Sequence, residues 1–253
     1  MRYSGSKARF MKELAPILTK HLDGENVFYD SFMGGGNVIS SIDYEYKVGN
    51  ELNSYVYGLW KVIQRKVLLG GKLEELLPES LTREEYDDVR NDYVNCTGKY
   101  PKWYIGYVGT CCSFGGAWFN GYAAYNPNKN EDHIKEAMNG LIRQAERFKH
   151  LNMTIFYNMS YDQLAYKEGS VIYCDPPYFM TKSYESDFDH ARFWEWVRYM
   201  HKKGYHVYVS EYTAPSDFKC IWSREKKDGM GSAMTGISKT KVERLFVYDD
   251  AEI

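Results

Sequence analysis

The stretch that decides the fold is Ser170-Val171-Ile172-Tyr173-Cys174-Asp175-Pro176-Pro177-Tyr178. It begins as a short apolar run of the kind that forms a buried strand. Two prolines then end the strand, because each lacks an N–H donor and has a fixed φ. The sequence therefore predicts a stiff corner that carries the carboxylate of Asp175, the carbonyl of Pro176 and the ring of Tyr178. It lies at the carboxyl end of a strand, the edge where open α/β sheets bind ligands.

The groups at this corner suit the exocyclic amine of adenine, a poor nucleophile because its lone pair is delocalised into the ring. Asp175 and the Pro176 carbonyl can accept hydrogen bonds from this amine and draw it toward a pyramidal geometry. Tyr178 can stack on the base, and such a contact stabilises by roughly 1–3 kcal/mol. A proline-capped strand with a surface aspartate is the alternative interpretation of the same four residues.

A strand predicted over 27–33 runs into Gly34-Gly35-Gly36, and Asn37 is expected to cap a helix through about residue 43. Strand, glycine turn and helix form the dinucleotide-binding arrangement in outline, without the glycine spacing of the phosphate-binding version. Adjacent glycines let a ligand lie flat against the backbone. A short strand over 47–50 ends at Glu51, where an acid commonly accepts from ribose hydroxyls. Together the pieces favour an adenosine-containing ligand over a plain turn with a surface acid.

The alternation of strands and helices stops between about residues 59 and 150 and then resumes. Inside this interval the pattern predicts two polar amphipathic helices, over 82–95 and 130–149, and leaves the aromatic segment 101–113 undecided. Outside it, helices are predicted over 7–21 and 189–203, and strands over 154–158, 206–210, 220–223 and 243–248.

A loop rich in glycine and aromatic residues, 114–122, lies within the interval and contains Trp118, Phe119 and Asn120. A loop that exposes such side chains suggests a binding surface. The alternative is a hydrophobic hairpin tucked under its own helices.

The 253-residue chain has a formal net charge of −2, so the whole chain is not a polyanion binder. The charge is unevenly placed, because residues 1–20 hold five bases against one acid and residues 223–244 hold six against three. Such patches can meet phosphates, although a solvated face is the commoner meaning of a charge run.

The five cysteines show neither a pairing pattern nor the spacing of metal ligands. No apolar run approaches the length needed to cross a membrane. We therefore expect a cytoplasmic protein with reduced thiols, no bound metal and no membrane partner.

The order of these motifs resembles the Dam-like DNA adenine methyltransferases, especially their short phage forms. Tyr3-Ser4-Gly5-Ser6-Lys7 resembles the family's N-terminal aromatic-x-Gly-x-Lys segment. The segment from Asp30 to Gly36 resembles its acid-x-Phe-x-Gly-x-Gly turn, and Asn50-Glu51-Leu52-Asn53 its ribose-binding acid. Asp162 matches the acid near the cofactor's adenine, and Asp175-Pro176-Pro177-Tyr178 the catalytic corner.

The resemblance implies an α/β fold: a Rossmann-like seven-stranded methyltransferase sheet with an inserted, mostly helical target-recognition domain. The catalytic domain that binds S-adenosylmethionine would comprise residues 1–58 and 151–253, and the DNA target-recognition domain residues 59–150. Double-stranded DNA would be the partner, and the protein would be a monomer or a weak dimer.

The same resemblance assigns roles to single residues. Asp175, Pro176 and Tyr178 would be catalytic, with the flipped-out adenine displacing the methyl group of S-adenosylmethionine directly. The cofactor would contact Tyr3, Lys7, Asp30, Gly34, Gly36, Glu51, Ser160, Asp162, Asp175 and Tyr184. Lys7 would meet its methionine carboxylate, Asp30 its amino group, Glu51 its ribose and Asp162 its adenine ring. DNA would contact Trp118, Asn120, Lys239 and Lys241.

Two departures from the family pattern stand out. Glu51 replaces the more usual aspartate and is one methylene longer. Where the family tends to carry arginine for guanine, this chain has Ala117-Trp118-Phe119-Asn120, and neither Trp nor Phe can offer two donors to a guanine edge. The pattern therefore does not predict GATC as the target. An RNA or protein-glutamine methyltransferase of the same fold and a catalytically silent DNA-binding decoy remain alternatives.

Overall fold

The computed structural model describes residues 1, 3–178, 188–227 and 240–249, and within them the backbone forms a seven-stranded mixed sheet. The strand order is β3-β2-β1-β4-β5-β7-β6. The first five of these pair in parallel, whereas β7 runs antiparallel to both β5 and β6. This arrangement confirms the predicted α/β methyltransferase sheet. The strands are β1 Phe28–Asp30, β2 Lys47–Asn50, β3 Ile155–Tyr157, β4 Val171–Cys174, β5 His206–Glu211, β6 Phe218–Lys227 and β7 Thr240–Tyr248.

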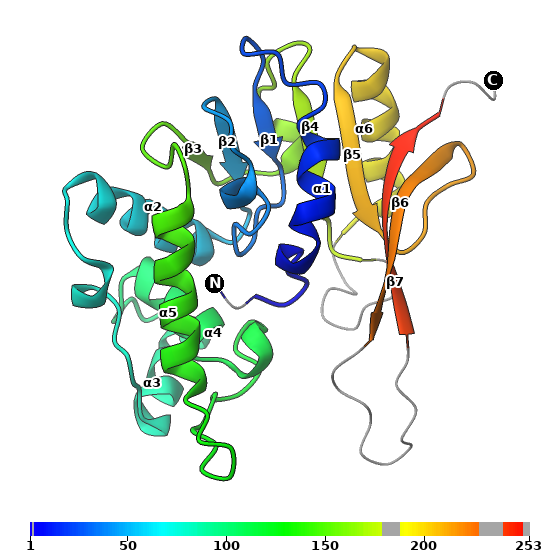
Figure 1. The fold of residues 1–253 in the computed structure, drawn as a ribbon. Coiled ribbons are helices and arrows are strands. Elements are labelled where there is room, and N and C mark those ends of the chain that lie inside the picture. The colour runs from blue at the N-terminus through cyan, green and yellow to red at the C-terminus, as the bar shows by residue number, and fades with distance from the viewer. Residues whose placement is uncertain (2, 179–187, 228–239, 250–253) are drawn as a thin grey trace.

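Helices cover both faces of the sheet, which is why its parallel strands read as continuous apolar runs. Alternate residues of β4 belong to different cores: Val171 and Tyr173 pack with α1 (Met11–Leu18), whereas Ile172 and Cys174 pack with α6 (His190–Lys202). Figure 1 shows α1 in front of the strands and α6 beside β5. The apolar run before Asp175 is thus a strand buried on both faces, as predicted.

A third core joins the helices of the middle segment to the sheet. It contains Trp60 of α2, Phe156 of β3 and residues of α3, α4 and α5. Asn53 caps α2 by accepting from the backbone N–H of Tyr55 at 2.9 Å. The predicted boundary between residues 58 and 59 falls inside α2. Residues 59–150, called the helical part below, therefore begin as a continuation of that helix. The helices are α2 Ser54–Leu68, α3 Arg83–Asn95, α4 Lys102–Cys111 and α5 His133–Arg147.

Several predicted elements differ in extent. The helix expected over 37–43 is only the 3-10 turn η2 (Ile39–Ser41). Ser40 and Ser41 each donate a hydroxyl hydrogen bond to the Asn37 carbonyl, and Ile42 is already extended at ψ 118°. These side-chain bonds compete with helix propagation. The undecided aromatic segment is α4, and α1 is preceded by η1 (Ala8–Phe10). The other 3-10 turns are η3 Leu73–Glu75, η4 Phe114–Gly116 and η5 Tyr161–Gln163.

Close packing of α4 on α2 depends on Gly106. A Cβ atom at this position would lie 2.2 Å from the carbonyl oxygen of Tyr55, which is backbone and cannot swing away. We expect Gly106→Ala to lower the free energy of unfolding by about 1–3 kcal/mol, the usual cost of overpacking. Gly140→Ala in α5 is the matched control, because no atom lies within 4 Å of its added Cβ. Urea unfolding of both variants tests the contact, and equal stability of the two would contradict it.

Candidate active site

Three acids meet at one edge of the sheet because they end or follow parallel strands. Asp30 ends β1, Glu51 follows β2 and Asp175 follows β4. Strands β1 and β4 are neighbours, with Asp30 opposite Tyr173 in the register, and the chain leaves them in opposite directions across the sheet. Such a switch point opens a crevice outside the carboxyl ends of the strands. The sequence-predicted acids are therefore brought together there.

The carboxylate of Asp175 is held by Lys7, which precedes η1. The Lys7 Nζ atom lies 2.9 Å from Oδ1 and 2.8 Å from Oδ2 of Asp175, and Lys7 is only 3 % exposed. Burial raises the pKa of Asp175, while the nearby Lys7 charge acts in the opposite direction. Lys7 thus contacts the Asp-Pro-Pro-Tyr corner itself in this structure.

Tyr178 is fixed by neighbours from other strands. Its hydroxyl donates to Oε2 of Glu243 at 2.9 Å, and its ring meets the ring of Tyr212 edge-on at 4.5 Å between centroids. The Lys7 ammonium lies 4.9 Å from the centre of the Tyr178 ring. The phenol is therefore contacted at its hydroxyl and at its ring.

Asp30 is a buried carboxyl group with one unused oxygen. It is 1 % exposed; its Oδ2 accepts from the backbone N–H of Ile39 at 3.2 Å, whereas Oδ1 has no hydrogen-bond partner among the described residues. Burial, with the nearby charges of Asp175 and Glu51, raises the pKa of Asp30 to about 8. A buried acceptor without a donor is costly, so this oxygen is suited to a positively charged ligand group.

Glu51 bridges the glycine turn and the start of α2. Its two carboxylate oxygens accept from the backbone N–H groups of Gly34 and Asn53, each at 2.8 Å. Burial raises the pKa of Glu51 to about 7, and these two bonds oppose that effect. Each carboxylate oxygen has a second acceptor site, so the side chain can still accept from ligand hydroxyls.

The space beside the three glycines is filled by the chain's own rings. A Cβ atom at Gly34 would lie 2.6 Å from Cε1 of Tyr3, and one at Gly36 would lie 2.6 Å from Cζ2 of Trp60. Gly34 and Gly36 also have positive φ, at 46° and 65°. These glycines are therefore required for packing as well as for the turn.

Asp162 lies after β3, within the turn η5. It accepts from the Ser160 hydroxyl at 2.5 Å and forms an ion pair with Arg192 of α6. Beside it, Tyr161 packs against Phe32, which follows β1. Ser160 and Asp162 thus lie together at the same edge of the sheet as the other acids, since β3 is also parallel.

The aromatic loop differs from its predicted exposure. Phe119 is 8 % exposed, and Trp118 packs against the rings of Tyr55, Tyr93 and Phe119 with its indole Nε1 buried and without a partner in the described residues. Asn120 is exposed. Trp118 and Phe119 therefore pack against α2 and α3, the alternative left open by the sequence, whereas Phe114 at the start of the loop remains exposed.

Three of the predicted site residues lie wholly or partly outside the described residues. Tyr184 and Lys239 lie outside the described residues, and Lys241 is described only by its backbone, in β7. Their assigned roles stay predictions.

Two residues near the site were missed by sequence reasoning, Glu243 and Arg192. Glu243 lies two residues before Leu245 on β7, so the two side chains share one face of the strand. A charged residue on the same face as a buried leucine was the signal that could have identified Glu243. Arg192 lies in the first turn of α6, and no pattern in the sequence distinguishes it from other surface arginines.

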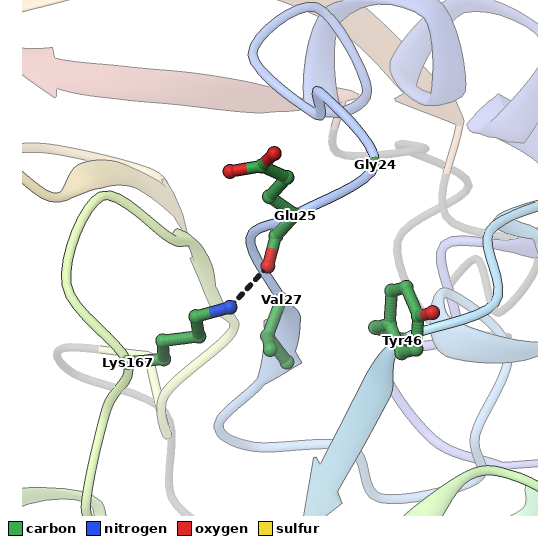
Figure 2. A pocket seen from close by; sticks show the side chains of 5 residues that line it. All are labelled: Gly24, Glu25, Val27, Tyr46 and Lys167. Atoms are coloured by element: carbon green, nitrogen blue, oxygen red, sulfur yellow. Dashed lines mark hydrogen bonds between the residues drawn. The ribbon is translucent and has the colours of Figure 1, made fainter.

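The small pocket drawn in Figure 2 lies at the other end of the sheet. It is lined by Gly24, Glu25, Val27, Tyr46 and Lys167, with Lys167 donating to the Glu25 carbonyl. Val27 directly precedes β1, so this pocket is at the amino ends of the strands, away from Asp30 and Asp175. The acid-lined edge remains the candidate active site because it holds the convergent polar groups.

Within the described ranges, no helix has the length and apolar character needed to cross a bilayer. The same residues contain no cluster of three or more His, Cys, Asp or Glu side chains arranged to hold a metal ion.

Comparison with known proteins gives a consistent picture. A sequence model of the D12 class N6 adenine-specific DNA methyltransferases matches residues 3–226. The modification methylase StsI of Streptococcus sanguinis is 24% identical over 195 residues, which cover 74% of this chain and 29% of that protein. The DNA adenine methylase of Salmonella typhi is 23% identical over 190 residues, 70% of this chain and 64% of that enzyme. The chain thus spans less than two thirds of either relative.

Proposed function

The chain belongs to the D12 class N6 adenine-specific DNA methyltransferase family, and from this premise we propose that it methylates the exocyclic amine of an adenine flipped out of double-stranded DNA. The family uses S-adenosylmethionine as methyl donor. A base inside a duplex cannot reach a site at the sheet edge, and flipping it out costs a few kcal/mol.

The observation that carries the proposal is the contact between Lys7 and Asp175. A protein amine donates to both oxygens of this carboxylate, at 2.8 and 2.9 Å, so both oxygens face a space that N–H donors can enter. The amine of adenine also presents N–H donors. Asp175, with the Pro176 carbonyl beside it, would accept from that amine once Lys7 moves aside, and Tyr178 would stack on the ring.

The acids at the edge of the sheet fit the cofactor. When bound, S-adenosylmethionine supplies a methyl group activated by positively charged sulfur. The unused Oδ1 of Asp30 would accept from its amino group, and Glu51 would accept from its ribose hydroxyls. Asp162 and Ser160 would meet its adenine ring. Positioning and electrostatics account for catalysis in this scheme, because the protein supplies no covalent step.

The helical part, residues 59–150, would recognise the target sequence. Its exposed Asn120 is the side chain of the loop best placed to reach base edges, since Trp118 and Phe119 are packed inward. Lys239 and Lys241 would contact phosphates, which fix the register of a protein on DNA without choosing a sequence.

Transfer of tritiated methyl groups from S-adenosylmethionine tests the proposed function. We expect unmethylated double-stranded DNA to be labelled, and RNA and protein extracts to remain unlabelled. Label in RNA or in protein glutamine would identify the other methyltransferase classes, and binding of DNA without transfer to any substrate would identify a decoy. Sequencing of methylated sites on a plasmid then gives the recognition sequence.

We expect Asn120→Ala to change which plasmid sites are methylated, because a lost base contact costs roughly 1–3 kcal/mol in discrimination. Asn152→Ala, an exposed asparagine before β3, is the control and should keep the wild-type pattern. Trp118→Ala should instead lower stability and reduce methylation at all sites alike. A site pattern unchanged in Asn120→Ala would remove this residue from base recognition.

A further inference from the structure

Strand β7 brings a buried carboxylate to the catalytic corner. Glu243 is 2 % exposed, although it lies close to Thr240, the first residue of β7. Glu243 lies two residues before Leu245, so both side chains point to the face of the sheet that α1 covers. Tyr173, two residues before Asp175, packs on the same face. Because side chains alternate along a strand, Glu243 and Asp175 point to the same side of the sheet. Lys7, which precedes α1 in the chain, lies on that side.

Glu243 contacts Tyr178, which would stack on adenine, and lies near Lys7, which holds Asp175. Its Oε2 accepts from the Tyr178 hydroxyl at 2.9 Å and lies 3.7 Å from the Lys7 Nζ atom. Its neighbour across the hairpin, Arg224, instead pairs with Glu13 of α1. A buried carboxylate is costly unless it is paired, so its place here needs a reason beyond the hairpin.

The position of Lys7 supplies that reason. In this structure its ammonium is closest to Asp175, at 2.8 Å, and further from Glu243, at 3.7 Å. If Asp175 is to accept from the adenine amine, Lys7 must give up part of this contact. An ammonium buried without a carboxylate would be strongly disfavoured. Glu243 is the second carboxylate within reach, and a short movement of the lysine side chain brings it there.

We infer that Glu243 is a positioning residue of the catalytic corner: it fixes the Tyr178 ring and receives the Lys7 ammonium when Asp175 takes the adenine amine. This inference rests on the proposed function. Glu243 therefore controls both the orientation of the Tyr178 ring, on which adenine would stack, and the release of Asp175 from Lys7. Glu243 does not touch the reacting atoms and acts through Lys7 and Tyr178.

Three variants separate the two tasks of Glu243. Glu243→Gln keeps an oxygen for the Tyr178 hydroxyl but cannot hold the Lys7 charge. Tyr178→Phe removes only the hydroxyl, and Glu243→Ala removes both interactions. We expect the turnover number on DNA to fall about tenfold in Glu243→Gln and about 100-fold in Glu243→Ala, as when positioned polar groups are lost. The dissociation constant for S-adenosylmethionine should change much less than turnover.

A second readout does not depend on methyl transfer. DNA carrying 2-aminopurine at a site mapped for the wild type becomes fluorescent when that base leaves the stack. We expect Glu243→Gln to weaken this signal at fixed protein concentration, because Lys7 stays on Asp175, and to do so without loss of thermal stability. Glu225→Gln on the exposed face of β6 makes the same chemical change and should behave as wild type.

The outcomes separate the two proposals. A wild-type protein that labels no DNA contradicts the proposed function. Suppose instead that the wild type labels DNA. Turnover and fluorescence within twofold of wild type in both Glu243→Gln and Glu243→Ala would then overturn the positioning role. A cofactor dissociation constant that rises as much as turnover falls also overturns it, since Glu243 would then serve cofactor binding. If Glu243→Ala fails to fold, the turnover and fluorescence of Glu243→Gln still decide.

Discussion

Asp175→Ala is expected to lower turnover on DNA by about 100-fold or more, as when one preorganised polar group is removed from a transition state. The alanine cannot accept from the adenine amine, and the Pro176 carbonyl is then the remaining acceptor of the corner. Cofactor affinity should change little, because Asp175 is expected to act mainly on the base. Single-turnover kinetics and calorimetric titration of S-adenosylmethionine measure the two effects separately.

The structure also predicts a stability cost for this variant. Removing one partner of a buried ion pair typically destabilises by about 3–5 kcal/mol. Lys7 retains Glu243 at 3.7 Å, so the loss should fall below that range. Asp175→Asn is the matched isosteric variant: it keeps one acceptor oxygen, and we expect intermediate turnover. A folded Asp175→Ala protein with near-normal turnover would exclude Asp175 from the mechanism.

Asp30→Asn is expected to act in opposite directions on stability and on cofactor binding. Burial raises the pKa of Asp30 from 3.8 to about 8, so the folded protein holds a proton that the unfolded chain releases above pH 4. The stability present below the unfolded pKa is therefore lost as pH rises toward 8, at about 1.4 kcal/mol per pH unit. Asparagine stays neutral, and the variant should be the more stable protein at pH 8.

Binding of S-adenosylmethionine should weaken in the same variant. A hydrogen bond to a charged group contributes about 1.5–3 kcal/mol, which corresponds to roughly tenfold or more in the dissociation constant. Denaturant unfolding of the wild type and of Asp30→Asn at pH 7 and pH 8 isolates Asp30, because Glu51 and the Met1 amine titrate in both proteins and cancel in the comparison. A stability difference between the two proteins that does not change in favour of Asp30→Asn across this window, or an unchanged cofactor affinity in Asp30→Asn, would each count against the assigned role.

The sequence by itself determined the strands and the acids that follow them. The apolar run before Asp175 and the glycine turn after Asp30 are local signals, because proline stops a strand and glycine permits the turn. Once these strands are parallel neighbours, their carboxyl ends must share an edge, so the meeting of Asp30, Glu51 and Asp175 follows from the sequence pattern. The family resemblance added the roles.

Only the tertiary structure decided which side chains surround those acids. Lys7 and Asp175 are 168 residues apart, and Tyr178 and Glu243 are 65 apart. Their contacts depend on how α1 packs against the sheet and on how β7 pairs with β5. Periodicity shows which residues are apolar but not which ring fills a given space. Trp118 was therefore expected at the surface, whereas it is half-buried and packs against the core of the helical part. Long-range packing overrode local exposure there, and it also made Glu243 part of the site.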